Sequence, residues 1–153
     1  MSAERPFQVE VERRIKAPPA DVFRHLVDPE LYVRWMGTEA MIDARPGGTF
    51  RIVVGGGPVA VGEYVVVEPP ELLVYTWGWE NDEAVPPGSS TVEISLREDG
   101  EETLLTLRHA GLPGDPMIAA HREGWTRYTE RLSVVATGGD PGPDEPMGGS
   151  DGR

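Results

Sequence analysis

Apolar and polar residues alternate at the start of the chain. The residues at every second position of this stretch are Phe7, Val9, Val11, Arg13 and Ile15. A period of two places successive side chains on opposite faces of a strand. The stretch from residue 7 to residue 15 therefore predicts a strand with one face against a core and the other face in solvent.

Short helices and further strands are predicted after this first strand. Residues 21–28 form a short amphipathic pattern, and Pro29 ends it and opens a second short helix that reaches Trp35. Beyond residue 40, runs that alternate or are rich in β-branched residues predict six more strands, at 41–44, 49–54, 59–68, 72–79, 91–97 and 103–109. Most connections are of hairpin length, so we expect an antiparallel sheet. The connection 80–90 is long for a hairpin, and it is either a lid over a binding site or a passive loop.

A single long helix is predicted near the C-terminal end. Asp115 suits the N-cap position and Pro116 the first turn, whereas Gly138 and Gly139 suit the end of the helix. Between them, mostly apolar residues recur every three or four positions, at Met117, His121, Gly124, Trp125, Tyr128, Leu132 and Val135. This spacing forms one stripe along roughly five helical turns, and such a stripe packs against another element.

Together these elements predict an α+β fold. One long helix can cover only one face of an antiparallel sheet of about seven strands. We therefore expect the sheet to curve around this helix, with the two short helices after the first strand closing one end. Aromatic rings either fill the space between helix and sheet or line a cavity there. The rings concerned are Trp35, Tyr64, Tyr75, Trp77, Trp79, Trp125 and Tyr128.

Composition narrows both the function and the domain boundaries. The chain has 153 residues, no cysteine and a formal net charge of −12. The length favours one domain, the acidity disfavours binding to nucleic acid, and the lack of cysteine excludes disulfides and thiolate chemistry. No apolar stretch suits a signal peptide or a membrane span, so we expect a cytoplasmic protein without membrane insertion. We place the folded domain at 1–137 and a disordered tail rich in Gly, Pro and acidic residues at 138–153.

Three polar residues on the predicted inner faces are candidate ligand contacts. His109 and His121 could orient a polar group, act in acid–base chemistry or serve as hydrogen-bonded wall residues. Arg13 needs a partner on its apolar face, either an acid such as Glu63 or Glu123 or the carboxylate of an acidic ligand. No metal-ligand spacing, nucleophile motif or phosphate-binding loop is present. We therefore expect no metal and no cofactor, and we assign no catalytic residue.

Several short motifs occur in a characteristic order along the chain. They are Arg13-x-Ile15-x-Ala17-Pro18 with Val22-Phe23, Asp28-Pro29-Glu30-Leu31 with Trp35, Asp43-x-Arg45-Pro46-Gly47-Gly48, Gly62, Pro69-Pro70-Glu71-x-Leu73 with Thr76-Trp77, and Gly124-Trp125 with Leu132. In this order they resemble the START-like (SRPBCC) superfamily, which shares the helix-grip fold of the birch-pollen allergen. From about residue 7 to residue 136, the chain is similar to the branch related to the C-terminal domain of the heat-shock-90 ATPase activator. The resemblance implies the helix-grip fold and an apolar cavity between the sheet and the last helix.

The first functional hypothesis is the binding of a small apolar or amphipathic molecule in that cavity. The residues expected to contact it are Arg13, Trp35, Tyr64, Tyr75, Trp77, His109, His121, Trp125 and Tyr128. Two alternatives stay open, because one fold hosts many functions. One is a cyclase or dehydratase acting on a poly-carbonyl precursor, with His109 or His121 as its acid or base. The other is a co-regulator of a chaperone that uses an exposed apolar patch.

Overall fold

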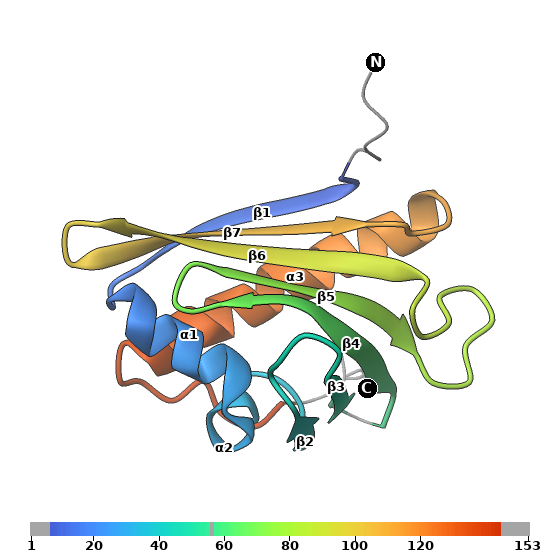
Figure 1. Cartoon of the computed structure of the whole chain (residues 1–153), viewed down its shortest axis with the longest axis horizontal. Coiled ribbons are helices and arrows are strands. Elements are labelled where there is room, and N and C mark those ends of the chain that lie inside the picture. Colours follow the sequence, from blue (N-terminus) through green and yellow to red (C-terminus); the bar gives the residue numbers. More distant parts are fainter. Residues whose placement is uncertain (1–6, 56, 145–153) are drawn as a thin grey trace.

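Seven antiparallel strands form one curved sheet around a long helix (Figure 1). The computed structural model describes residues 7–55 and 57–144. In chain order the elements are β1 (Val9–Ile15), α1 (Pro19–Val27), α2 (Pro29–Tyr32), β2 (Glu39–Ile42), β3 (Thr49–Val53), β4 (Val59–Glu68), β5 (Leu72–Trp79), β6 (Ser90–Asp99), β7 (Glu102–Ala110) and α3 (Asp115–Ala136). The predicted α+β helix-grip fold is confirmed, including the two short helices after the first strand.

The first strand completes the sheet by pairing with the last one. β1 lies antiparallel to β7, with Val9 opposite His109 and Ile15 opposite Thr103. Every other pair of neighbours in the order β1-β7-β6-β5-β4-β3-β2 joins strands that are consecutive in the sequence. The predicted alternation is confirmed within the strand, where Val9, Val11 and Ile15 are buried, whereas Phe7 lies before the strand and is exposed. The first and last strands of the chain thus lie side by side, and α3 packs against β1.

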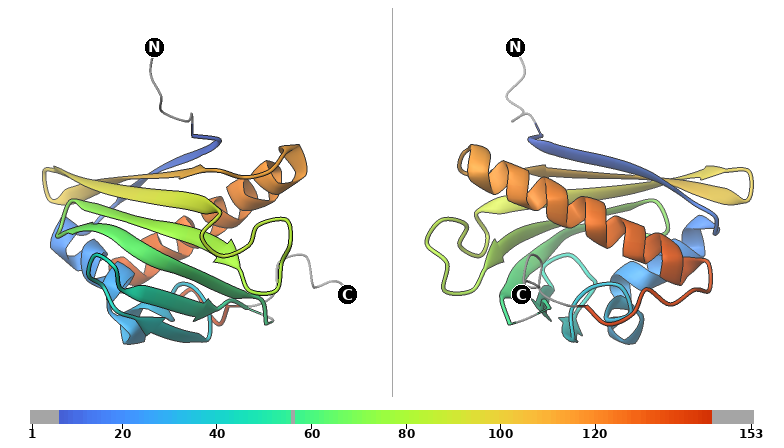
Figure 2. Two further views of the ribbon diagram at one scale, coloured as in Figure 1. Left: turned by 45° about the vertical axis from the view of Figure 1, so that its right-hand side comes forward. Right: turned by 180° about the vertical axis from the view of Figure 1, so that it is seen from behind.

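α3 crosses the inner face of the sheet, and α1 and α2 lie at one end of it (Figure 2). The N-cap of α3 is Gly114, with a φ of 103°, and Asp115 is the first helical residue. The prediction of Asp115 as the N-cap is therefore wrong by one position. Its carboxylate instead lies in the first turn, where it complements the positive end of the helix dipole. Among the described residues, no helix has both the length and the hydropathy needed to cross a membrane.

The core lies between the inner face of the sheet and the three helices. Trp35, which follows α2, is almost completely buried, and its Nε1 donates a hydrogen bond to the carbonyl oxygen of His25 at 2.8 Å. Arg131 of α3 donates from Nε to the carbonyl oxygen of Trp35, also at 2.8 Å. Through backbone carbonyl groups, these two bonds connect three parts of the chain: α1, the segment that follows α2, and α3 itself. They therefore fix the end of the domain that the short helices close.

The chain turns back across the domain after α3. Arg131 donates hydrogen bonds to the carbonyl oxygens of Pro141 and Gly142, at 3.2 and 2.9 Å, and the Asp144 side chain is completely buried. Residues 138–144 therefore differ from the disordered tail expected there, because polar bonds fix them and their composition gives no sign of those bonds. The rest of the predicted tail, 145–153, lies outside the described residues.

Candidate functional site

A cavity of about 360 Å³ lies between α3 and the sheet. This volume is in the range of small-molecule sites, and it equals the space of about a dozen water molecules, so it suits a ligand of roughly a dozen non-hydrogen atoms. Its walls come from β5, α3, the β3–β4 turn and the residue that follows Trp35. The lining residues are Met36, Val54, Gly55, Pro58, Trp77, Trp79, Ala120, His121, Gly124, Trp125 and Tyr128.

Three indole rings dominate the wall, and we call this space the indole cavity. The Trp77 ring centroid lies 5.3 Å from that of Trp79 and 5.0 Å from that of Trp125. β5 supplies Trp77 and Trp79 two residues apart, so both project from the same face of the strand, and α3 supplies Trp125. Within the described residues, Trp77 Nε1 is buried and has no hydrogen-bond partner. Buried donors without a partner are uncommon.

His109 lies directly behind the cavity and is completely buried. Its Nδ1 accepts a hydrogen bond from Trp125 Nε1 at 3.0 Å, and its Nε2 lies 2.9 Å from Ser90 Oγ. Ser90 Oγ donates to the carbonyl oxygen of Trp77 at 2.7 Å. An indole can only donate, so Nε2 carries the proton of the neutral imidazole. Burial, and to a smaller extent the nearby His121, lowers the pKa of His109 to about 3.

His121 lies in the cavity wall and is also fully hydrogen-bonded. Its Nδ1 donates to the carbonyl oxygen of Met117 at 2.8 Å, and its Nε2 accepts from Trp79 Nε1 at 3.1 Å. Burial lowers the pKa of His121, although the bond to Met117 and the charge of Asp82 act in the opposite direction. Both ring nitrogens of each histidine are thus occupied by partners from the protein. In the described part of the chain, no group of three or more histidines and carboxylates is placed to hold a metal ion.

α3 faces the cavity with small residues, Ala120 and Gly124. A Cβ atom built at Gly124 would meet no atom within 4 Å. Glycine inside a helix costs about 1 kcal/mol relative to alanine. The absent side chain therefore weakens the helix slightly and leaves the cavity open at this point.

A second aromatic group, formed by Tyr32, Phe50, Tyr64 and Tyr75, leaves almost no space between its rings. We call it the filled cluster. The void among these residues and their aliphatic neighbours is about 10 Å³, which is the size of at most one water molecule. The Phe50 ring centroid lies 4.9 Å from that of Tyr75 and 5.7 Å from that of Tyr64. Burial raises the pKa of Tyr64 and Tyr75 above the ordinary value.

Arg13 lies outside the indole cavity and binds α3 directly. Its Nε donates to Thr129 Oγ1 at 3.0 Å, and its NH2 donates to the carbonyl oxygen of Thr126 at 3.1 Å. The expected ion pair with Glu63 or Glu123 is therefore wrong, because a hydroxyl and a backbone carbonyl near the middle of α3 supply the acceptors.

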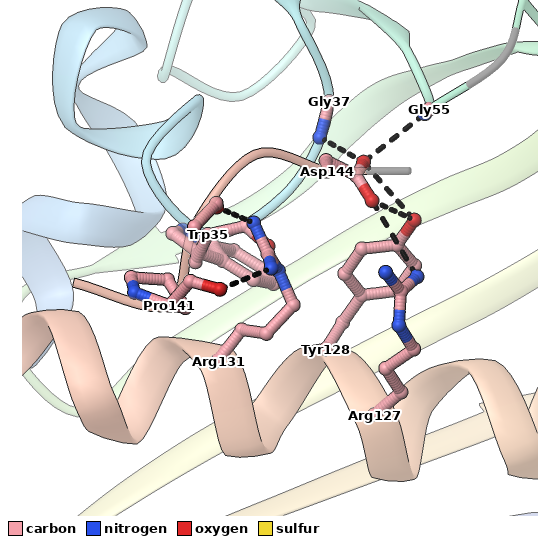
Figure 3. Close-up of polar contacts among 9 residues, drawn as sticks. Trp35, Gly37, Gly55, Arg127, Tyr128, Arg131, Pro141 and Asp144 are labelled. Atoms are coloured by element: carbon pink, nitrogen blue, oxygen red, sulfur yellow. Dashed lines mark hydrogen bonds and ion pairs between the residues drawn. The ribbon is translucent and has the colours of Figure 1, made fainter. Parts of the chain in front are cut away.

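The carboxylate of Asp144 lies in a cradle of donors from three other parts of the chain (Figure 3). Oδ2 accepts from the backbone N–H groups of Gly37 at 2.6 Å and Gly55 at 3.0 Å. The Tyr128 hydroxyl donates to Oδ1 at 2.8 Å, and Arg127 NH1 lies 3.4 Å from the same atom. Burial, followed by the bond to Asp144, raises the pKa of Tyr128 above its ordinary value. The phenol therefore stays protonated and acts as a donor.

The structure brings together only part of the predicted contact set. Trp77, His121, Trp125 and Tyr128 line the indole cavity, and His109 is one hydrogen bond behind it. The residues that lie elsewhere are Arg13, Trp35, Tyr64 and Tyr75. Trp79, predicted as a ring but not as a contact, also lines the cavity, as do the unpredicted Gly55, Pro58 and Ala120. A glycine within the helical stripe, Gly124, was the available signal for open space.

The loop between β5 and β6 is anchored at its centre. The Val85 side chain is completely buried, and its carbonyl oxygen accepts a hydrogen bond from the backbone N–H of Trp79 at 2.7 Å. Asp82 Oδ1 accepts from the N–H groups of Ala84 and Val85, at 2.7 and 3.2 Å. The loop thus supports the backbone of Trp79, a wall residue of the cavity.

The curved sheet, the long helix and the cavity between them define a helix-grip protein of the START-like superfamily. Within that superfamily, the chain belongs to the family of activator of Hsp90 ATPase homologue 1-like proteins, whose family model matches residues 16–137. None of the curated proteins compared with the chain matches it.

Several solved structures are similar to this chain. An AHSA1-like protein from Rhizobium etli is 50% identical, with 89% of this chain and 85% of that one covered and a TM-score of 0.72. CalU16 from Micromonospora echinospora is 31% identical, with 93% of this chain and 70% of that one covered and a TM-score of 0.71. An HSP90 activator from Plasmodium falciparum is 22% identical, with coverages of 84% and 94% and a TM-score of 0.70. At that identity, the likeness shows the fold alone.

Proposed function

We propose that this protein binds a small, mainly apolar molecule in the indole cavity. The observation that carries the proposal is the juxtaposition of three indole rings with the unfilled position at Gly124. A core that served stability alone would gain from a side chain at that position, because a better-filled interior is more stable. The space next to Gly124 is instead open, and the rings that line it offer a large apolar contact area.

The expected energetics suit reversible binding. Burial of about 300 Å² of apolar ligand surface contributes on the order of 7 kcal/mol before the entropy lost on association. Few polar groups of the wall are free to bind a ligand, since the ring nitrogens of His121 are occupied by Trp79 and Met117. Shape and apolar area therefore set the selectivity of the cavity.

Neither alternative function gains a specific supporting observation. A cyclase or dehydratase needs an imidazole nitrogen within reach of a substrate proton, and in this conformation partners from the protein occupy both histidines. A chaperone-binding surface needs a contiguous apolar patch. The large apolar side chains most exposed among the described residues are Phe7, Met41 and Val65, which lie before β1, on β2 and on β4.

The test uses decan-1-ol, which has about the number of heavy atoms that the cavity accommodates. Titration should change the fluorescence of Trp77, Trp79 and Trp125, which line the cavity. The variant Gly124→Leu places a side chain into the open space, so we expect at least a ten-fold loss of decanol affinity.

The matched control is Ala119→Leu. Ala119 is an exposed residue of the same helix and does not line the cavity, so this variant should bind decanol as the wild type does. Leucine is a good helix former at either position, and circular dichroism checks that both variants are folded. Equal affinities for the two leucine variants, or no binding of decanol to the wild type, would overturn the proposal.

A further inference from the structure

The cradle around Asp144 has the chemistry of an anion-binding site. It offers two backbone N–H groups, one phenolic hydroxyl and one guanidinium to a single carboxylate. Converging N–H groups with a nearby positive charge form a typical concavity for anions. We propose that this cradle is a binding site for the carboxylate of an amphipathic ligand, and that Asp144 occupies it as an internal substitute when no such ligand is bound.

The donors of the cradle are positioned by glycines that cannot easily be replaced. Gly37 has a φ of 83°, and a Cβ there would lie 2.7 Å from atoms of Ile52 and Val53. At Gly55, a Cβ would lie 2.7 Å from the carbonyl oxygen of Asp144 and 2.9 Å from its carboxyl carbon. The lack of a side chain at both glycines thus lets a carboxylate approach the backbone N–H groups closely.

The cradle adjoins the indole cavity. Gly55 and Tyr128 belong to the walls of both, and the neighbouring residues Met36 and Val54 also line the cavity. One molecule could therefore place an apolar body among the indole rings and a carboxylate against Gly37, Gly55 and Tyr128. This inference rests on the proposed function, because it assigns the head group of the ligand that the cavity would hold.

Few side chains attach the segment that carries Asp144, and that of Asp144 is the buried one. Between residue 137 and residue 143 no side chain is buried, and the other side-chain anchors are the two bonds from Arg131 to Pro141 and Gly142. A groove of about 570 Å³ runs along the segment, lined by it and by Val33, Arg34 and Val135. A segment packed so loosely can leave its site without exposing apolar core.

Exchange of one carboxylate for another conserves the charge of the site. Arg127 would pair with the ligand carboxylate as it now pairs with Asp144, at 3.4 Å. A neutral head group would give Arg127 and the two glycine N–H groups a weaker acceptor. Desolvated donors bind a charged acceptor more strongly than a neutral one. The site should therefore select a carboxylate over an alcohol of the same chain length.

The experiment compares decanoate with decan-1-ol on the wild type and on Asp144→Ala. Loss of the internal competitor should raise decanoate affinity by about ten-fold, because a larger fraction of the protein is then competent to bind. Decanol affinity should change by less than about three-fold. The control variant is Asp140→Ala, since Asp140 only accepts a local bond from Gly142 at an exposed turn. This variant should bind both probes as the wild type does.

Acetate separates the anion site from the cavity. At fixed ionic strength, acetate should raise the melting temperature of Asp144→Ala and leave that of the wild type unchanged, with chloride as the reference anion. If decanol binds but Asp144→Ala gains nothing for decanoate or acetate, the cavity proposal stands and the anion site is refuted. If neither decanol nor decanoate binds any variant, the proposed function fails, and the acetate response alone then decides the anion site.

Nuclear magnetic resonance of the wild type covers the case in which Asp144→Ala does not fold. Decanoate at millimolar concentration should shift the amide signals of Gly37 and Gly55, because its carboxylate replaces that of Asp144 at both N–H groups. Decan-1-ol should leave the signal of Gly37 in place while it shifts signals of the cavity wall, to which Gly55 belongs. Identical shifts from the two probes would mean that Asp144 has a structural role only.

Discussion

Two aromatic regions lie between the sheet and the helices, and only one of them is hollow. The indole cavity has a volume of about 360 Å³, whereas the filled cluster around Phe50 leaves about 10 Å³. Both contain large rings from β5, with Trp77 and Trp79 in the first and Tyr75 in the second. Ring content therefore does not decide which region is hollow.

The residues opposite the rings decide it. In the filled cluster, Leu26 of α1 and Tyr32 of α2 enter the space and meet Phe50 and Tyr75. In the indole cavity, the wall includes several small or turn residues, among them Gly55, Ala120 and Gly124. Packed interiors have few voids larger than a water molecule, so the unfilled region stands out as the place for a ligand. The following predictions test this division between packing and binding.

The largest effect should come from truncation within the filled cluster. Leu73 is 2% exposed and lines the small void, so Leu73→Ala should lower the free energy of unfolding by about 3 kcal/mol. Urea denaturation measures this loss. Decanol affinity, measured where the variant is folded, should stay within about two-fold of the wild type. A ten-fold change in affinity would show that the two regions are not separate.

The next largest effect should come from acidification, and it acts on the side of the indole cavity. His109 has a pKa of about 3 in the folded protein and about 6.5 when unfolded. Between these pH values His109 is protonated in the unfolded chain but not in the folded one. The free energy of unfolding is therefore highest above pH 6.5 and decreases as the pH falls below that value. The loss by pH 5 should be about 2 kcal/mol.

The variant His109→Gln isolates that loss, because glutamine retains hydrogen-bonding groups but cannot titrate in this range. Urea denaturation at pH 7 and pH 5 should give a smaller fall for the variant than for the wild type. The buried tyrosines of the filled cluster, with their raised pKa values, should contribute nothing in this window and destabilise the fold only as the pH rises through 10. Equal falls for the two proteins would rule out His109 as the cause.

A smaller effect is expected from removing the hydrogen bond between the indole of Trp79 and His121. Trp79→Phe keeps an aromatic ring but removes the N–H that Nε2 of His121 accepts at 3.1 Å. We expect a loss of about 1 kcal/mol in stability and a rise in the pKa of His121, because the bond favours its neutral form. An imidazole titration by nuclear magnetic resonance measures the pKa.

The control for this change is Trp77→Phe. Its Nε1 has no partner among the described residues, so the pKa of His121 should stay close to the wild-type value. A similar rise in both variants would attribute the shift to altered burial and not to the hydrogen bond.

The smallest effect should have the opposite sign. Gly124→Ala adds a methyl group that meets no atom within 4 Å and improves helix propensity, so the protein should gain about 0.5–1 kcal/mol. Thermal unfolding measures the gain, and decanol affinity should fall slightly because the methyl group takes space from the cavity. A loss of stability would show that the position is already filled.

The strand and helix pattern could be predicted because it rests on local periodicity. Val9, Val11 and Ile15 alternate with polar residues, and the stripe through Trp125 and Leu132 has helical spacing, so each element is fixed by its own residues. The order of elements then left few ways to bury both the sheet and the helix. The cap of α3 was missed because Gly114 enters the helix through its backbone conformation and not through a side-chain bond.

The candidate site was less predictable because it depends on what lies opposite each ring. Nothing in the local pattern distinguishes Tyr75 from Trp77, two residues apart on β5. Tertiary packing places Leu26 near the first and Gly124 near the second. Asp144 was missed for a similar reason, since its segment has the composition of a disordered tail and donors distant in the sequence, among them those at Gly37 and Gly55, give it a fixed place.

The bonds of Asp144 also bear on the order in which the protein folds. Its Oδ2 atom joins residues that are 107 and 89 positions away in the sequence. Closing loops of this size costs chain entropy before the contact stabilises anything, and both partners lie in segments that need the sheet to be in place. We expect these contacts to form last, so that each newly folded molecule passes through a state with a complete sheet and helix and an open cradle.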